Sequence, residues 1–313
     1  PLLPKGDIII YGGNPNYTDT LRRINELKDV GFHFMGIGIS GGEEGARRGP
    51  SIMPGGNEEA YQEVAPILKA VAAKVNDQPC VAYLGKEAAG HYVKMVHNGI
   101  EYSIMQLLSE CYDLMHNGIQ MSNEDLHEVF KSWDSGEMKS FLLEITAAIF
   151  TKKDDKTNNF LVDVILDKAG AKGTGKWTSQ EGLDLPMPIP TIDVAVMMRN
   201  LSSLIDERKE AADLYKTSLK KIDIDKEEFV KLLHDALYFA TIISYAQGLA
   251  MLTTASAELK MEIPLPEVVS VWRGGCIIRL ALLDLFKDAY QNADLKNLLL
   301  NENIAKILRE KEA

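Results

Sequence analysis

The chain has 313 residues, enough for about two domains of ordinary size and a large hydrophobic core. Hydrophobic residues make up 46% of the sequence and charged residues 25%, which is typical of a globular protein in water. The formal net charge of -11 leaves no general basic surface, so we expect no nucleic-acid partner.

Residues 1–87 alternate strand-like and helix-like segments. The strand "DIIIYGG" is followed by the helical pattern "TDTLRRINELKDVG", the strand "FHFMGIGISGG", the helical "NEEAYQEVAPILKAVAAKV" and the short strand "CVAYLG". Strands that alternate with helices in this way predict a parallel α/β sheet.

Gly-rich turns follow two of these strands. The turn in "IIIYGGN" places Asn14 after the first strand, at the edge where cofactors bind in open α/β sheets. The segment "GISGGEEGARRGP" offers Ser40 and the backbone N–H groups of Gly41 and Gly42, and such a turn can hold a carboxylate or a phosphate. The sequence contains no GxGxxG fingerprint with an acidic or basic partner.

From Ala88 onward the pattern is helical almost throughout, with breaks at segments such as "KGTGKW" and "LPMPIP". This change predicts a domain boundary near residue 87 and an all-α domain over residues 88–313. The segment "EVFKSWDSGEMKSFLL" resembles the later "EVVSVWRGGCIIRLALL", so we expect the helical domain to be internally duplicated.

The helical segment "GHYVKMVHNGIEY" carries polar side chains where a core helix would be apolar. They lie at i, i+3, i+4, i+7 and i+8, one face of an α-helix, and are Lys94, His97, Asn98, Glu101 and Tyr102. The other side is largely apolar, so we expect a helix that is buried on one side and lines a cleft on the other. Burial can lower the pKa of a lysine and raise that of a glutamate, which makes a base and an acid available near neutral pH.

The repeat offers a comparison for this helix. Traced back from Trp133 and Trp272, "HNGIEYSIMQLL" aligns with "ATIISYAQGLAM". The places of the first four polar residues are then taken by Leu237, Ala240, Thr241 and Ser244. This alignment predicts that the helix of the second copy serves packing alone.

Further segments offer groups for an anion such as a phosphate. The loop "KGTGKWT" contributes Lys172 and Thr174, and Arg199 stands alone in the apolar "AVMMRNLSS", where a structural ion pair is the alternative. The six histidines have no metal-binding spacing, so we expect no metal site.

The cysteines and the hydropathy pattern bear on the compartment. Cys80, Cys111 and Cys276 are widely spaced in apolar segments, which favours a reducing compartment over a disulfide scaffold. Neither a run of about 18 apolar residues nor a signal-peptide pattern stands out. We expect a cytoplasmic protein without a membrane partner.

Taken together, "SGGEEGARRGPSIMPGGN", "KMVHNGIEYSIMQL", "KGTGKWT", "SSLIDER" and "VWRGGCIIR" closely resemble the 6-phosphogluconate dehydrogenase family over nearly the whole chain. The resemblance implies a cytoplasmic homodimer that oxidises 6-phosphogluconate with NADP and releases CO2 and ribulose 5-phosphate. It also implies that residues 1–87 are part of a dinucleotide-binding domain and that residues 88–313 form the substrate and dimerisation domain.

The resemblance implies a role for each residue named above. Lys94 matches the general base that takes the proton from the substrate 3-hydroxyl, and Glu101 matches the acid that protonates C1 after decarboxylation. The residues implied around the substrate carboxylate and hydroxyls are Ser40, Gly41, Gly42, His97 and Asn98. Those implied around the phosphate are Tyr102, Lys172, Thr174 and Arg199, and Asn14 is implied on the cofactor side.

The sequence departs from the family pattern at three points. The Gly-rich turn that binds the dinucleotide and the C-terminal segment that reaches the partner subunit are absent, and Tyr11 replaces the Asp of the usual "DGGN". We therefore expect weakened substrate binding, very weak cofactor binding and no NADPH production by these 313 residues alone. Two alternatives stay open: a β-hydroxyacid dehydrogenase for another acid, and a non-catalytic helical dimerisation or binding fragment.

Overall fold

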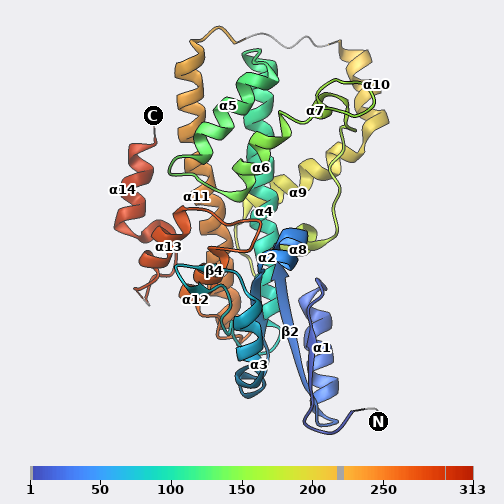
Figure 1. Ribbon diagram of the computed structural model, residues 1–313, viewed down its shortest axis with the longest axis vertical. Helices are drawn as coiled ribbons and strands as arrows, with labels where there is room; N and C mark the ends of the chain where they lie inside the picture. The colour runs from blue at the N-terminus through green and yellow to red at the C-terminus, as the bar shows by residue number, and fades with distance from the viewer. Residues whose placement is uncertain (1–2, 217–221, 293, 313) are drawn as a thin grey trace.

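The computed structural model describes residues 3–216, 222–292 and 294–312. A small α/β part lies at one end of the molecule and a larger helical part extends from it (Figure 1). The α/β part contains β1 (Ile8–Tyr11), α1 (Tyr17–Lys28), β2 (His33–Ser40), α2 (Gly42–Arg48), β3 (Ser51–Gly55), α3 (Glu58–Val71), β4 (Lys74–Val75) and β5 (Gln78–Pro79). The predicted order of an α/β segment followed by a larger helical segment is confirmed.

The helical part is built around two long helices, α4 and α11. Its elements are α4 (Ala89–Asp113), the π-helical turn η1 (Leu114–Gly118), α5 (Asn123–Asp134), α6 (Phe141–Ile149), α7 (Leu161–Val164), α8 (Thr174–Asp184), α9 (Pro190–Ser203), α10 (Ile205–Tyr215), α11 (Lys226–Glu258), α12 (Leu265–Trp272), α13 (Leu282–Ala289), the 3-10 turn η2 (Leu298–Leu300) and α14 (Glu302–Glu310).

The main sheet has the order β1-β2-β3 and is mixed. β1 and β2 are parallel, as predicted, but β3, a strand that the sequence patterns did not predict, runs antiparallel to β2, so the prediction of a parallel sheet is wrong for the sheet as a whole. Only residues 41–50 join β2 to β3, whereas a parallel crossover needs about a dozen residues or more. The predicted strand "CVAYLG" contributes a single bridge, from Val81 to Ile52.

The first turns of α4 lie directly on β2 and β3. A Cβ at Gly90 would overlap the carbonyl oxygens of Gly36 and Met53, and a Cβ at Gly38 would overlap the side chain of Lys94. Glycine at these positions therefore permits an approach that any side chain would prevent. Every residue from Ala89 to Ile100 is buried as a result. The domain boundary near residue 87 stays a prediction, because α4 packs on the strands that precede it.

The helical part contains the predicted duplication. We call α4, α5 and α6 the first copy and α11, α12 and α13 the second copy. α4 and α11 run side by side in opposite directions (Figure 1). An antiparallel bridge between Ser140 and Leu280 joins the two copies at their centre. Each copy therefore meets the other with the same elements in the opposite orientation.

The aromatic contacts between the copies correct the alignment of α4 with α11. His97 of the first copy lies edge-on to Trp272 of the second, at 5.8 Å between ring centroids and 75° between ring planes. His234 of the second copy lies in the same way against Trp133 of the first, at 5.5 Å and 64°. His97 therefore corresponds to His234 and not to Ala240. The predicted alignment is wrong by six residues, because the local similarity between the two segments on which it rested does not follow the way the two copies pack.

The corrected alignment places Lys231, His234, Asp235 and Tyr238 opposite Lys94, His97, Asn98 and Glu101. The helix of the second copy is thus polar over these positions, contrary to the prediction from sequence. α11 is nevertheless a core helix over most of its length. It contains an 18-residue window apolar enough to cross a membrane, but 67% of that window is buried inside the protein.

Candidate active site

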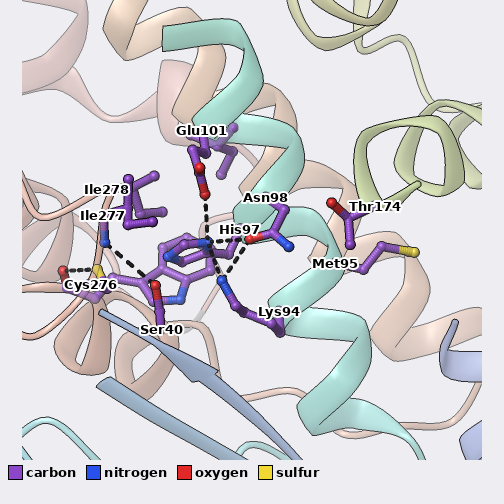
Figure 2. A network of polar contacts seen from close by, with 12 residues as sticks. Ser40, Lys94, Met95, His97, Asn98, Glu101, Thr174, Cys276, Ile277 and Ile278 are labelled. Carbon is purple, nitrogen blue, oxygen red and sulfur yellow. Dashed lines mark hydrogen bonds and ion pairs between the residues drawn. The ribbon is translucent and has the colours of Figure 1, made fainter. Parts of the chain in front are cut away.

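Three polar side chains on α4 contact one another at the end of β2 (Figure 2). Lys94 Nζ donates to Asn98 Oδ1 at 2.6 Å and lies 3.2 Å from His97 Nδ1. His97 Nδ1 is in turn 3.1 Å from Asn98 Oδ1 and 4.0 Å from Glu101 Oε2. The predicted stripe is therefore one connected group of base, imidazole, amide and acid on a single helix face.

Burial sets the charge states in this group. Removal from water lowers the pKa of Lys94 to about 8, although the negative charge of Glu101 opposes this change. Burial also lowers the pKa of His97 well below its usual value, and the charge of Lys94 adds to this effect. Burial raises the pKa of Glu101, against the attraction of Lys94 and Arg199. Lysine and glutamate are thus both shifted toward neutral forms, which suits a base and an acid that work in turn.

Ser40 lies beside this group at the end of β2 (Figure 2). Its hydroxyl is buried and accepts a hydrogen bond from the backbone N–H of Ile277 at 3.4 Å. Gly41 follows at a φ of 123°, where a Cβ would overlap the carbonyl oxygen of Gly275. The turn that contains Ser40, Gly41 and Gly42 therefore lies against the loop after α12, beside Lys94 on α4 (Figure 2).

A second group of predicted residues surrounds the next turn of α4. The Arg199 guanidinium from α9 lies 3.7 Å above the centre of the Tyr102 ring and also donates to the carbonyl oxygen of Gly170. Tyr102 packs on the start of α8, because a Cβ at Gly175 would lie 2.5 Å from its ring. Thr174, the first residue of α8, is buried there. A helix N-terminus with an arginine beside it favours an anion such as a phosphate.

A buried carboxylate holds α8 in place. The hydroxyl of Tyr17 on α1 donates to both oxygens of Glu181 at 3.0 and 2.9 Å, and that of Tyr92 on α4 donates at 3.3 Å. Thr178 Oγ1 on α8 donates to the carbonyl oxygen of Met95 at 2.9 Å. These bonds fix the helix that carries Thr174 to α4, which carries Lys94.

Two predicted residues lie at the edge of the arrangement. Lys172 is exposed, two residues before the start of α8. Asn14 is exposed just past the end of β1. A hollow of about 550 Å³ lies instead at the opposite end of β2, beside His33 and Tyr83, and contains none of the predicted residues.

The loop after α12 is the part of the arrangement that reasoning from single residues missed. Cys276 acts electrostatically on Lys94, and Ile277 donates to Ser40. Trp272 packs against His97. The signal in the sequence is the Gly-rich segment "VWRGGCIIR" of the repeat, which supports the family resemblance without indicating which of its residues face α4. In the described parts of the chain, no three His, Cys, Asp or Glu side chains are grouped as metal ligands.

Comparison with known proteins places this geometry in context. The family model for the NAD binding domain of 6-phosphogluconate dehydrogenase matches residues 1–85, and that for the 6-phosphogluconate dehydrogenase C-terminal domain matches residues 90–313. The chain is 51% identical over 310 residues to the NADP(+)-dependent, decarboxylating 6-phosphogluconate dehydrogenase of Bacillus subtilis, covering 98% of this chain and 66% of that protein.

Two further proteins are similar. The decarboxylating 6-phosphogluconate dehydrogenase of Escherichia coli is 53% identical over 302 residues, which cover 96% of this chain and 64% of that protein. A solved structure of Plasmodium falciparum 6-phosphogluconate dehydrogenase, described as apo and in complex with NADP+ and 6-phosphogluconate, superposes with a TM-score of 0.95 at 46% identity. The match covers 98% of this chain and 67% of that structure. The chain thus spans about two thirds of the length of these relatives.

Proposed function

Because the chain belongs to the 6-phosphogluconate dehydrogenase family, we propose that it contributes the substrate-binding and acid-base groups for oxidative decarboxylation of 6-phosphogluconate to ribulose 5-phosphate and CO2. The observation that carries this proposal is the pair Lys94 and Glu101. They lie two turns apart on one face of α4, and burial shifts the pKa of each toward the neutral form.

Lys94 acts first in the proposed reaction. Its neutral amine accepts the proton of the substrate 3-hydroxyl while C3 loses a hydride, so that a ketone forms at C3. NADP is the hydride acceptor that we propose, and its place is beyond the end of β1, where Asn14 is exposed. The relatives in the comparison include an NADP(+)-dependent enzyme and a structure with NADP+.

Glu101 acts after the loss of CO2. The carboxylate at C1, which is β to the new ketone, leaves as CO2, and the electron pair of the broken C1–C2 bond forms an enediol between substrate carbons C2 and C3, which are C1 and C2 of the product. The Lys94 ammonium can return its proton to the developing enolate oxygen, which stabilises the charge. Protonated Glu101 then gives its proton to C1 of the product while the Lys94 amine takes back the proton of the C2 hydroxyl, so that the C2 ketone of ribulose 5-phosphate forms.

The remaining residues are assigned to the two ends of the substrate. Ser40, Gly41, Gly42, His97 and Asn98 would bind the carboxylate and hydroxyl groups. Tyr102, Lys172, Thr174 and Arg199 would bind the phosphate. The second assignment is supported by the position of Arg199 over Tyr102 and of Thr174 at the start of α8.

We also propose that the chain works in the cytoplasm as a homodimer. Cys80, Cys111 and Cys276 are all free thiols, as in a reducing compartment. Large apolar side chains are exposed on α9 and in the segment before α8. We propose that a second molecule of this protein covers them in the dimer. They include Met197 at 63%, Leu166 at 68% and Ile165 at 58% exposure. A monomer by light scattering at micromolar concentration would contradict the dimer.

Two other functions are tested by the same experiment. A β-hydroxyacid dehydrogenase for another acid would not need the phosphate group of residues, and a non-catalytic helical module would bind no sugar acid. Calorimetry of the purified chain with 6-phosphogluconate, gluconate and NADP distinguishes them. We expect binding of 6-phosphogluconate that is at least about tenfold tighter than that of gluconate, since charge-assisted bonds to phosphate are strong. Equal affinities would support the other dehydrogenase, and no binding of either acid would support the helical module.

A further inference from the structure

Among the residues that the structure describes, the second ring nitrogen of His97 has no hydrogen-bond partner. Nδ1 faces Asn98 and Lys94, but Nε2 is buried and makes no hydrogen bond within the described parts of the chain. Leaving a buried polar atom without a hydrogen bond destabilises the fold, so the surroundings of Nε2 are expected to supply a partner.

Trp272 carries a complementary atom beside it. The two rings are 5.8 Å apart between centroids and nearly perpendicular, and both residues are fully buried. The indole Nε1–H of Trp272 is also buried without a hydrogen-bond partner in the residues that the structure describes. An indole N–H can only donate, and an imidazole Nε2 can accept when the proton is on Nδ1. The unpaired donor and the unpaired nitrogen are thus on neighbouring rings.

We propose that Trp272 is a positioning residue for the reaction, whose indole N–H donates through one bridging water to His97 Nε2 and so holds the imidazole proton on Nδ1. The consequence for catalysis rests on the proposed function, because it concerns Lys94 as the base. Trp272 comes from the second copy and touches neither substrate nor cofactor in this proposal. It acts only through His97.

The tautomer of His97 bears directly on Lys94. A proton on Nδ1 points toward Asn98 Oδ1 and lies near the Lys94 amine, 3.2 Å from Nδ1. In that state His97 cannot accept a hydrogen bond from a Lys94 ammonium, so the neutral amine is favoured. The other groups that face Lys94 are Glu101 on α4 and Cys276 in the loop after α12, and both favour the charged form. His97 and burial therefore both favour the neutral amine of Lys94, whereas Glu101 and Cys276 favour its ammonium form.

The second copy supplies a matched control. Trp133 lies edge-on to His234 at 5.5 Å, as Trp272 does to His97. Asp235 and the ammonium of Lys311 take the places of Asn98 and Lys94, with Lys311 Nζ 2.7 Å from Asp235 Oδ1. Trp133→Phe therefore removes an equivalent indole from an equivalent pair without changing the candidate active site.

Nitrogen NMR of the ligand-free chain, labelled with 15N-histidine, tests the proposal. Wild-type His97 should be neutral with its proton on Nδ1, and its signal is identified by its loss in His97→Asn. Trp272→Phe should shift the signal toward the Nε2-protonated form, whereas Trp133→Phe should leave it unchanged. A wild-type His97 protonated on Nε2 overturns the proposal without any tryptophan variant, and so does an unchanged tautomer in folded Trp272→Phe.

A second readout follows Lys94 itself. The pKa of Lys94, measured by NMR of labelled lysine, should rise by roughly half to one pH unit in Trp272→Phe, because a neutral hydrogen bond contributes about 0.5–1.5 kcal/mol. In the protein at its full natural length, kcat should then require a higher pH while KM for the substrate stays nearly constant. If Trp272 had only a structural role, its replacement would not shift the pH dependence of kcat.

The two proposals fail in different ways. The tautomer and the lysine titration are measured without substrate, so they stand whether or not 6-phosphogluconate binds. Failure of substrate binding with an intact Nδ1 tautomer would contradict the proposed function alone. An unchanged lysine titration in Trp272→Phe, with normal substrate binding, would contradict the role of Trp272 alone.

Discussion

In the first copy of the helical repeat, α4 carries Lys94, His97 and Asn98, and in the second copy α11 carries Lys231, His234 and Asp235 at the same spacing. The environments differ far more than the residues do. Lys94 is 6% exposed beneath β2, whereas Lys231 is exposed at the end of α11 that lies farthest from the sheet (Figure 1).

The acid of the first copy is also lost in the second. Tyr238 stands at the position of Glu101, and the Lys311 ammonium from the end of α14 lies on Asp235 and over the Tyr238 ring. The second copy thus has a cation, an imidazole and a carboxylate in contact without a sheet to bury them. The comparison teaches that the chemistry of α4 depends on packing against β2 and β3 at least as much as on residue type.

The largest expected difference between the two copies is in kcat, when the lysine of each copy is replaced. Lys94→Met should lower kcat of the protein at its full natural length by on the order of 10² to 10⁴, because a positioned general base contributes that much. Lys231→Met should change kcat by less than about twofold, since exposed substitutions usually have small effects. Initial rates of NADPH formation at 340 nm measure both. Similar losses in the two variants would mean that the copies are not functionally distinct.

The next effect concerns acid stability, which should depend on the buried end of α4. Burial lowers the pKa of His91 to about 4, while an unfolded histidine titrates near 6.5. The unfolded state therefore binds the proton first, and the free energy of unfolding should fall as the pH drops from about 6.5 to 4. The loss amounts to roughly 3 kcal/mol.

His91→Asn should remove most of that pH dependence. Urea unfolding at several pH values between 4 and 7 measures it, and the comparison is made on slopes because the substitution also lowers stability at neutral pH. An unchanged slope in the variant would assign the acid sensitivity of the protein to other groups.

A third effect separates the two ends of the proposed substrate. Arg199→Ala should weaken binding of 6-phosphogluconate by about ten- to a hundredfold and leave gluconate binding nearly unchanged, since hydrogen bonds to charged groups contribute about 1.5–3 kcal/mol. Arg208→Ala on the neighbouring α10 is the control, because the Arg208 guanidinium is already paired with Asp167, at 2.6 Å. Calorimetry with each ligand gives the two affinities. Parallel losses for both ligands would place Arg199 away from the phosphate.

The smallest effect is expected at the ammonium of the second copy. Lys311 and Asp235 are 22% and 17% exposed, so Lys311→Met should lower the free energy of unfolding by about 0.5–1 kcal/mol. Binding of 6-phosphogluconate should not change. Thermal unfolding and calorimetry measure the two quantities. Weaker ligand binding in this variant would show that the second copy influences the first across the helical part.

Sequence predicted the polar face of α4 well, because helical spacing is a local property. Lys94, His97, Asn98 and Glu101 were found from their positions alone, and the fold order followed from strand and helix patterns. The antiparallel β3 was missed because "SIMPG" contains Pro and Gly, which are unfavourable in strands. The sheet direction then depended on the short connection through α2.

The contacts between distant segments were beyond the sequence. Trp272 could be seen as part of a repeat, but its contact with His97 depends on how two antiparallel copies pack. The same packing fixes the alignment of α4 with α11, which similarity of residues alone placed six residues away. Burial of Lys94 likewise depends on Gly38, whose role appears only when the helix lies on the strand.

The hydrogen bond between Ser40 and Ile277 joins residues that are 237 positions apart. At a synthesis rate of about 5–20 residues per second, roughly ten to fifty seconds therefore pass between synthesis of the end of β2 and synthesis of the loop after α12 that covers it. The interval is almost as long for Ser51, because its Oγ donates to the carbonyl oxygen of Val271, 220 positions away. Over that interval, β2, β3 and the first turns of α4 leave the ribosome without the segment that closes their polar groups. The nascent chain therefore exposes these polar groups to solvent until α12 and the loop after it have been made.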